Sequence, residues 1–208
     1  MTVYDVVVIG GGINGTAIAR DAAIRGLSVA LLERDDLGSQ TSSWSSRMIH
    51  GGLRYLEQLD FRLVRESLRE REILFSLAPH LVRPMHITIP VFADSTRNRL
   101  TLRTGMLLYD VFSPRKSVPR HEVLSRDQVI DRVPGLRRDG LRGAVAYTDG
   151  QVELSERLCV ELALDAERHG AVVHTKTAVT GIEIADARAT AVMVDREGGT
   201  QRFGARCV

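Results

Sequence analysis

A glycine-rich turn near the start of the chain constrains the fold more than any other feature of the sequence. The run Gly10-Gly11-Gly12-Ile13-Asn14-Gly15 follows residues 6–9, an apolar and β-branched stretch typical of a strand buried on both faces. Residues 16–25 then have the composition of a helix, and residues 27–32 predict a second strand that ends at Glu33. The order strand, glycine turn, helix, strand and acid predicts a β-α-β unit of a parallel sheet.

Each glycine has a physical task in such a unit. Gly10 permits a sharp turn, Gly12 lets the backbone approach a pyrophosphate, and Gly15 lets the helix lie close to the sheet. The helix N-terminus offers free N–H groups and a positive dipole end to phosphates. Glu33 follows at close to the roughly 20-residue spacing at which an acid binds an adenosine ribose, and its charge disfavours the 2′-phosphate of NADP. The unit predicts an adenine dinucleotide site without distinguishing FAD from NAD, the alternative being a tight turn that binds nothing.

Composition narrows the class of protein. The 208 residues, 44% of them hydrophobic and 26% charged, suffice for one substantial α/β domain. A net charge of +2 provides no strong field for nucleic acid, which we exclude as a partner. The sequence contains no run of about 20 apolar residues, and because it enters the first strand within a few residues we expect no signal peptide. Cys159 and Cys207 are isolated, so we expect a cytoplasmic chain with no metal site.

The middle of the chain predicts a long helix over residues 61–77. Asp60 is its expected N-cap, and an apolar face repeats at helical spacing at Phe61, Val64, Leu68 and Phe75. Its charged residues predict an opposite face exposed to solvent, formed by Arg62, Arg65, Arg69, Arg71, Glu66, Glu70 and Glu72.

Further elements follow from local patterns. We expect a strand over 86–92 with Pro90 at an edge or end, a helix over 97–112, a short helix with a capping box at Ser125 and Gln128, a strand over 144–147, a helix over 154–169 and a strand over 171–174. Three short runs, 178–184, 190–195 and 200–203, predict a small antiparallel meander, and residues 206–208 would return to the main sheet.

These elements predict an α/β fold in three segments. Residues 1–50 form the first part of a dinucleotide-binding domain, 51–145 an inserted segment, and 146–208 the continuation of the domain with its meander. The chain stops as an apolar run begins, so we expect a sequence truncated within a strand.

Residues 35–50 form a polar, hydroxyl-rich connector at the carboxyl end of the second strand, where open sheets bind ligands. We therefore expect a ligand-facing loop rather than a solvated linker.

Three stretches together point to a known family, and the third is the most specific: residues 9–15, then Asp21 with Arg25-Gly26, and the run Ser45-Ser46-Arg47-Met48-Ile49-His50-Gly51-Gly52-Leu53-Arg54-Tyr55-Leu56-Glu57. On these residues the chain resembles the FAD-dependent, quinone-linked glycerol-3-phosphate dehydrogenases, and it covers less than half of a usual member. It departs from them at Ala17, where the family usually has Gly, at Arg47, where Lys is common, and at Trp44, where residues are usually small.

The resemblance implies a Rossmann-like FAD-binding domain of the glutathione-reductase or amino-acid-oxidase type, with an inserted segment of the substrate domain. It implies oxidation of glycerol 3-phosphate to dihydroxyacetone phosphate by hydride transfer to the flavin, followed by electron transfer to a quinone. It also implies peripheral association with the inner face of the cell membrane, through parts outside this sequence, and a possible homodimer.

The resemblance also assigns site residues. Arg54 and Tyr55 would bind substrate, Arg54 because a guanidinium grips phosphate oxygens bidentately. His50 would lie beside the isoalloxazine, or be an ordinary loop histidine. The expected cofactor-binding residues are Gly10, Gly11, Gly12, Asn14, Gly15, Glu33, Arg34, Ser42, Ser43, Ser45, Ser46, Arg47, His50, Gly51 and Val179. The catalytic base is unknown and is expected beyond Val208.

Other functions stay open at this point. The same scaffold could reduce O₂ as a glycerophosphate oxidase, or belong to an amine or amino-acid oxidase of the related group. The run from His50 to Tyr55 disfavours the latter. The 208 residues could also form a non-catalytic FAD-binding fragment, and we expect them to be inactive by themselves.

Overall fold

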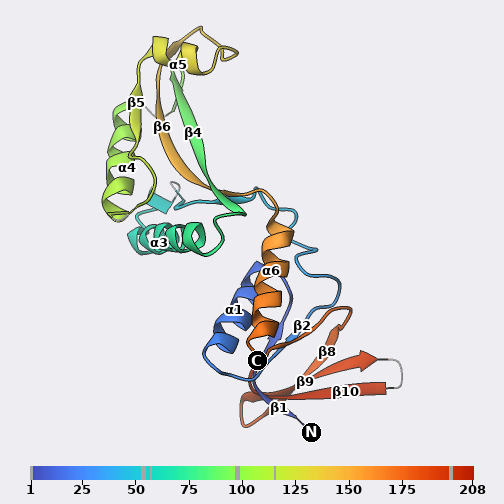
Figure 1. Cartoon of the computed structure of the whole chain (residues 1–208). Helices are drawn as coiled ribbons and strands as arrows, with labels where there is room; N and C mark the ends of the chain where they lie inside the picture. Colours follow the sequence, from blue (N-terminus) through green and yellow to red (C-terminus); the bar gives the residue numbers. More distant parts are fainter. Residues whose placement is uncertain (1, 53–54, 57, 97–98, 115, 197–198) are drawn as a thin grey trace. The chain divides into compact units, whose positions relative to one another are not determined.

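The computed structural model describes residues 2–52, 55–56, 58–96, 99–114, 116–196 and 199–208. The chain divides into two compact units (Figure 1). The first unit comprises Met1–Arg47 and Leu154–Val208, and the second comprises Met48–Glu153. Residues 146–153, expected with the C-terminal segment, therefore lie in the second unit.

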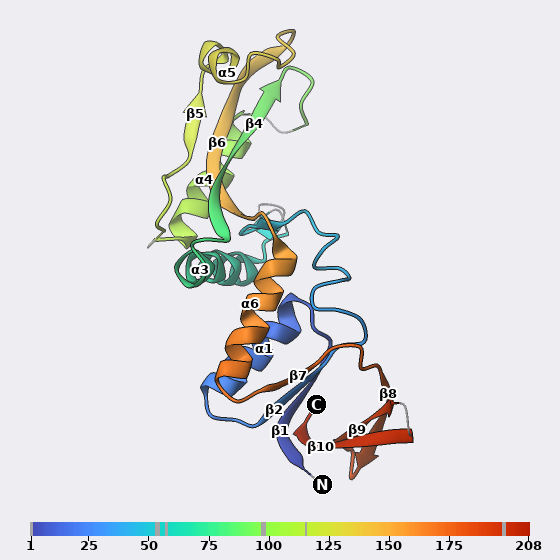
Figure 2. The same ribbon diagram turned by 45° about the vertical axis from the view of Figure 1, so that its right-hand side comes forward.

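The first unit is built on a six-stranded sheet. Its strand order is β7 (Val172–His174), β2 (Val29–Leu32), β1 (Val3–Ile9), β10 (Gly199–Cys207), β9 (Arg188–Arg196) and β8 (Val179–Ala185). The first four of these strands are mutually parallel, and β10, β9 and β8 form the predicted antiparallel meander (Figure 2). The expected β-α-β unit and the meander are thus both confirmed.

Strand β10 joins the two parts of this sheet. Its first residues, from Gly199 to Gly204, pair antiparallel with β9, whereas Gly204 to Cys207 pair in parallel with β1. The two separate runs expected from the sequence, 200–203 and 206–208, are therefore one continuous strand.

Two helices cover one face of this sheet. Helix α1 (Ile13–Ile24) and helix α6 (Ser155–Arg168) lie side by side in both ribbon views. Alanines line their contact, and Ala19 and Ala166 are fully buried, because small side chains allow close approach of two helices. Arg20 Nε donates to Asp165 Oδ2 at 2.5 Å between them.

Strands β1 and β2 carry apolar residues on both faces, as predicted. Val8, Val29 and Leu31 belong to the cluster under the helices, whereas Val7, Ala30 and Leu32 pack with Phe203 of β10 and residues of β9. This alternation follows the two-residue period of a strand, and all four residues of β2 are buried.

The second unit contains a second sheet. Strand β4 (Val82–Phe92) pairs antiparallel with β6 (Leu141–Val152) along its length, while β3 (Met48–Ile49) and β5 (Glu122–Leu124) pair with the opposite edge of β6. β4 is an edge strand, as Pro90 predicted, since proline cannot donate to a neighbouring strand. The expected strand at 144–147 is the middle of the longer β6.

Three helices accompany this sheet: α3 (Phe61–Leu77), α4 (Arg99–Phe112) and α5 (Arg126–Arg132). Both predicted caps are confirmed. Asp60 accepts from the Leu63 backbone N–H at 3.1 Å, and Ser125 with Gln128 forms the capping box. No helix in the described part of the chain combines the length and apolar character that crossing a membrane requires.

One prediction for α3 is wrong. Arg71 was expected on the exposed charged face, but it is only 1% exposed and lies in the buried stripe with Val64 and Leu68. It follows Leu68 by three positions and Val64 by seven, which is the spacing of the buried face. The Arg71 guanidinium forms an ion pair with the buried carboxylate of Asp149.

Candidate functional site

Two positions of the glycine turn between β1 and α1 require glycine, one for its backbone conformation and one for lack of space. Gly10 has a φ of 103°, in the region that favours glycine. A Cβ on Gly15 would lie 1.9 Å from the Gly10 carbonyl oxygen and 3.4 Å from Val8 Cγ1. Gly15 therefore lets the first turn of α1 lie against the end of β1.

The N-terminus of α1 carries no side-chain cap from its own N-cap residue, Gly12, and no acidic residue in its first turn. Ser42 comes from the hydroxyl-rich loop and accepts from the Ile13 backbone N–H at 3.0 Å. A Cβ on Gly12 would lie 3.2 Å from the same Ser42 Oγ. No residue of the first turn of α1 thus places a negative charge at the positive end of the helix dipole, which suits an anion, while the Glu33 carboxylate binds the Gly11 N–H just before the helix.

Glu33 fixes the geometry beside the turn. Its side chain is 9% exposed. Oε2 accepts from the Gly11 backbone N–H at 2.5 Å, and Oε1 accepts from the Asp35 backbone N–H at 2.7 Å. Each carboxylate oxygen can accept a second bond, so these contacts leave room for the predicted ribose contact, which stays a prediction.

A cleft of about 420 Å³ opens at the carboxyl ends of β1 and β2, within the range of small-molecule sites. Six predicted cofactor residues line it: Gly10, Gly12, Glu33, Arg34, Ser42 and Val179. The remainder of the lining is Ile9, Leu32, Ser39, Gln40, Thr41, Thr177 and Ala178. Residues from both ends of the chain therefore form one cleft within the first unit.

Ser39 is a lining residue that the sequence reasoning missed. Its hydroxyl is buried, and among the residues that the structure describes it has no hydrogen-bond partner. A buried hydroxyl without a partner is costly, and a polar ligand in the cleft would satisfy it. The only available signal was its position in the polar connector after the second strand.

The other predicted residues of the loop hold the loop itself. Ser43 Oγ donates to the Gly38 carbonyl at 2.5 Å, and Ser45 Oγ accepts from the Arg47 backbone N–H at 3.1 Å. Arg47, with a φ of 58°, donates to Glu156 Oε1 of α6 at 2.6 Å. The predicted residues of the first unit that do not line the cleft are Gly11, Asn14, Gly15, Ser43, Ser45, Ser46 and Arg47. Their cofactor contacts stay predictions.

The remaining predicted residues belong to the second unit. Arg54 lies outside the described residues. Exposed His50 precedes the glycine pair, and its Nδ1 accepts from the Gly52 backbone N–H at 2.9 Å. An accepting nitrogen carries no proton, so the neutral ring holds its proton on Nε2. Tyr55 is half-buried against the cluster of Leu56 and its neighbours.

Gly51 and Gly52 are required by their surroundings. A Cβ on Gly51 would lie 2.6 Å from Leu68 and 2.7 Å from the Tyr109 hydroxyl. Gly52 has a φ of 65°, and a Cβ there would lie 2.2 Å from the Tyr55 ring. The Tyr109 hydroxyl accepts from the Gly51 backbone N–H at 2.8 Å.

A buried polar network lies behind this turn, and the sequence reasoning missed it. The Tyr109 hydroxyl donates to Asp149, with its oxygen 2.8 Å from Oδ1, and Arg71 Nη1 donates to the same oxygen at 2.6 Å. Burial raises the pKa of Asp149, although the Arg71 guanidinium and the Tyr109 hydroxyl oppose the shift. Burial and the neighbouring Asp149 likewise raise the pKa of Tyr109 far above its usual value and that of Tyr147 to about 12.

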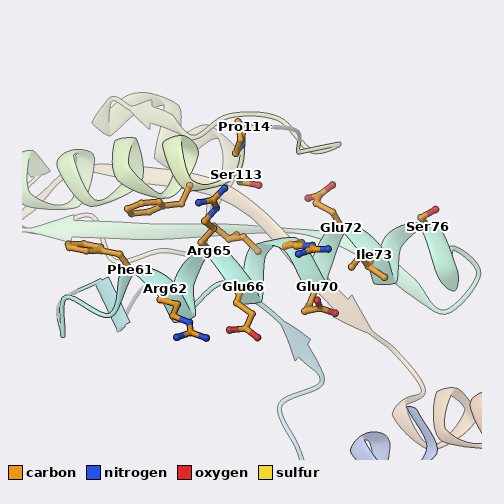
Figure 3. A pocket seen from close by; sticks show the side chains of 13 residues that line it. Phe61, Arg62, Arg65, Glu66, Glu70, Glu72, Ile73, Ser76, Ser113 and Pro114 are labelled. Carbon is orange, nitrogen blue, oxygen red and sulfur yellow. The ribbon is translucent and has the colours of Figure 1, made fainter. Parts of the chain in front are cut away.

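A larger groove, of about 1180 Å³, runs along α3 and the segment after α4 (Figure 3). Arg65 and Glu72 point to the side of Ser113, whereas Arg62 points away from it. The groove is lined by both arginines and glutamates, so its charge is mixed in sign. Among the described residues, its lining includes none of the predicted site residues. We therefore take the smaller cleft, in the first unit, and the Gly51 turn, in the second unit, as two separate candidate regions.

Comparison with known proteins identifies the family of the chain. Residues 5–208 match the family described as FAD dependent oxidoreductase. A glycerol-3-phosphate dehydrogenase of Synechocystis sp. is 52% identical over 182 residues, which cover 88% of this chain and 33% of that protein. The chain thus spans about a third of the length of this curated relative.

Solved structures share the fold. The glycerol-3-phosphate dehydrogenase of Bacillus halodurans, complexed with FAD, superposes with a TM-score of 0.71 at 25% identity over 98% of this chain and 33% of its own. An L-α-glycerophosphate oxidase of Mycoplasma pneumoniae with FAD bound has a TM-score of 0.74 at 18% identity, over 99% of this chain and 53% of its own. Because the family model matches residues 5–208, nearly the whole length of the chain, the chain belongs to the family of FAD-dependent oxidoreductases.

Proposed function

We propose that this chain binds FAD in the cleft of its first unit and contributes to the oxidation of glycerol 3-phosphate to dihydroxyacetone phosphate. The cleft carries the cofactor part of the proposal, because it combines the N-terminus of α1, whose first turn has no acidic side chain, with the buried Ser39 hydroxyl, which has no hydrogen-bond partner among the described residues. The 52% identity to a glycerol-3-phosphate dehydrogenase supports the choice of substrate.

The residues of the cleft fit the parts of FAD. The N–H groups at the start of α1 would bind the pyrophosphate, and Glu33 would accept from the ribose. Ser39 and Ser42 would donate hydroxyl hydrogen bonds, and the backbone near Val179 would contact the adenine. When bound, FAD supplies the hydride acceptor, and the protein supplies binding and orientation.

The segment after β3 would bind the substrate. Arg54 would hold the phosphate by bidentate hydrogen bonds, with Tyr55 beside it. His50 has its Nδ1 occupied by the Gly52 N–H and presents its Nε2–H, so it can donate a hydrogen bond but has no free nitrogen to accept a proton in this geometry. We therefore assign His50 to orientation of the substrate or the flavin and leave the base unassigned.

The partners of the complete protein follow from the same proposal. A membrane quinone would accept the electrons. The protein would associate peripherally with the inner face of the cell membrane, from the cytoplasmic side, as a monomer or a homodimer. O₂ as acceptor would make the protein an oxidase instead.

The test is substrate-dependent loss of the visible flavin absorbance in the purified, FAD-loaded complete protein without oxygen. Glycerol 3-phosphate should bleach the flavin, whereas glycerol, glycine and proline should not, because they lack the phosphate. Bleaching by an amino acid but not by glycerol 3-phosphate would refute the proposal. Reoxidation by a soluble quinone compared with O₂ then identifies the acceptor.

A further inference from the structure

A fully buried arginine lies at the centre of the second unit. Arg71 is 1% exposed, and its side chain donates to carboxylates on two sides, to Asp149 Oδ1 at 2.6 Å and to Glu72 Oε1 at 2.7 Å. Glu72 in turn accepts from the backbone and hydroxyl of Ser117, at 2.8 and 2.7 Å. The arginine thus connects α3, β6 and the segment after α4.

The other end of this network is the Gly51 turn. Tyr109 has one hydroxyl proton, which it donates to Asp149, and its oxygen accepts from the Gly51 N–H. Because Asp149 takes the proton, the lone pairs of the hydroxyl are directed at the turn. A chain of hydrogen bonds therefore runs from Arg71 through Asp149 and Tyr109 to the backbone just after His50.

Close packing also constrains the backbone at Gly51. The Gly51 backbone lies so close to Leu68 and the Tyr109 hydroxyl that neither residue leaves room for a Cβ. The Tyr55 backbone N–H donates to the Gly52 carbonyl at 2.8 Å, which closes the turn. The turn is held by backbone hydrogen bonds on one side and by van der Waals contact on the other.

Stability alone does not account for such an arrangement. A buried ion pair contributes little net stability compared with apolar residues of similar size, because both charges lose their hydration. What a satisfied polar network provides is a single geometry, since each group has a direction as well as a position. The geometry specified here is that of the turn between His50 and Tyr55.

We infer that Arg71, Asp149 and Tyr109 are positioning residues, a buried anchor that fixes the Gly51 turn and so orients His50 and Tyr55 for the substrate. The effect on the turn stands on the contacts alone, whereas the effect on catalysis rests on the proposed function. None of the three residues needs to touch substrate or cofactor.

The test is Tyr109→Phe in the complete protein, with Tyr147→Phe as matched control. Phenylalanine keeps the ring and its edge-to-face contact with Tyr147, whose centroid lies 5.9 Å away, but removes the bond to Gly51. Tyr147 is in the same cluster, and within the described residues its hydroxyl makes no hydrogen bond. Two quantities are measured: amide hydrogen exchange at Gly51 by NMR, and kcat and KM for glycerol 3-phosphate at equal flavin content.

Tyr109→Phe should accelerate exchange at Gly51 and lower kcat/KM, each by about tenfold, while Tyr147→Phe leaves both within about twofold. Unchanged Gly51 exchange in Tyr109→Phe would overturn the anchor, and accelerated exchange with unchanged kcat/KM would overturn its catalytic role. If Tyr109→Phe fails to fold, Asp149→Asn must show the same two changes or the inference is wrong. Absence of glycerol 3-phosphate oxidation in the unmodified protein would refute the proposed function, and the exchange measurement would still decide the anchor.

Discussion

The substitution Gly15→Ala tests the cofactor cleft most directly. The added Cβ would lie 1.9 Å from the Gly10 carbonyl oxygen, and real Cβ atoms do not approach closer than 3.0 Å. The two groups must therefore move apart by at least about 1.1 Å. The carbonyl oxygen is a backbone atom, and the added Cβ is attached directly to the backbone. α1 must therefore shift relative to the end of β1.

The size of the effect follows from that displacement. A shift of about 1 Å lengthens N–H···O contacts with a phosphate from about 2.9 Å to beyond hydrogen-bonding distance. Loss of one or two hydrogen bonds to a charged group costs about 2–4 kcal/mol, so FAD should bind at least about 30-fold more weakly. Crowding at the turn should also destabilise the protein by about 1–3 kcal/mol.

The assay is a titration of the apoprotein with FAD in which binding is monitored by the quenching of flavin fluorescence. Thermal unfolding of the same samples measures stability. The matched control is Gly105→Ala in α4, where a Cβ would meet nothing within 4 Å. There alanine should stabilise the helix by up to about 1 kcal/mol and leave FAD affinity unchanged. A well-folded Gly15→Ala protein that binds FAD as tightly as the parent would refute the assignment of the cleft.

Three further substitutions have effects of predictable sign. Ser39→Ala should raise the melting temperature of the apoprotein, because it removes a buried hydroxyl without a partner among the described residues. In the same titration it should weaken FAD binding several-fold. A change of the same sign in apoprotein stability and in FAD affinity would contradict this role. Glu33→Gln should lower both FAD affinity and apoprotein stability, because an amide cannot accept from both backbone N–H groups that the carboxylate binds; calorimetry showing unchanged stability would argue against it. Burial would raise the pKa of Asp110, but hydrogen bonds from Lys116 and His121 outweigh it and hold the pKa below its usual range. Asp110 therefore contributes stability above its usual pKa, and that stability is lost as pH falls through its lowered value, so Asp110→Asn should flatten the acid limb of a plot of unfolding free energy against pH.

The sequence alone predicted the features that depend on neighbouring residues. The β-α-β unit, the meander, the bounds of α3 and both helix caps follow from periodicity and from residues three or four positions apart. The glycine turn and Glu33 were also identified, because their spacing is local to one structural unit. The expected cofactor residues that line the cleft, Val179 excepted, lie within the first 42 residues.

Only the tertiary structure decided the partners of groups far apart in the chain. Arg71 sits at a core position of α3 because Asp149, 78 residues later, is there to receive its charge. Within one sheet, β10 pairs antiparallel with β9 and in parallel with β1, a strand about 200 residues earlier in the chain. The Ser39 hydroxyl is buried by the folding of the chain around it. Periodicity reports which face of an element is apolar, but whether a charged residue is buried depends on a distant partner. Such partners are brought together only by the folded chain.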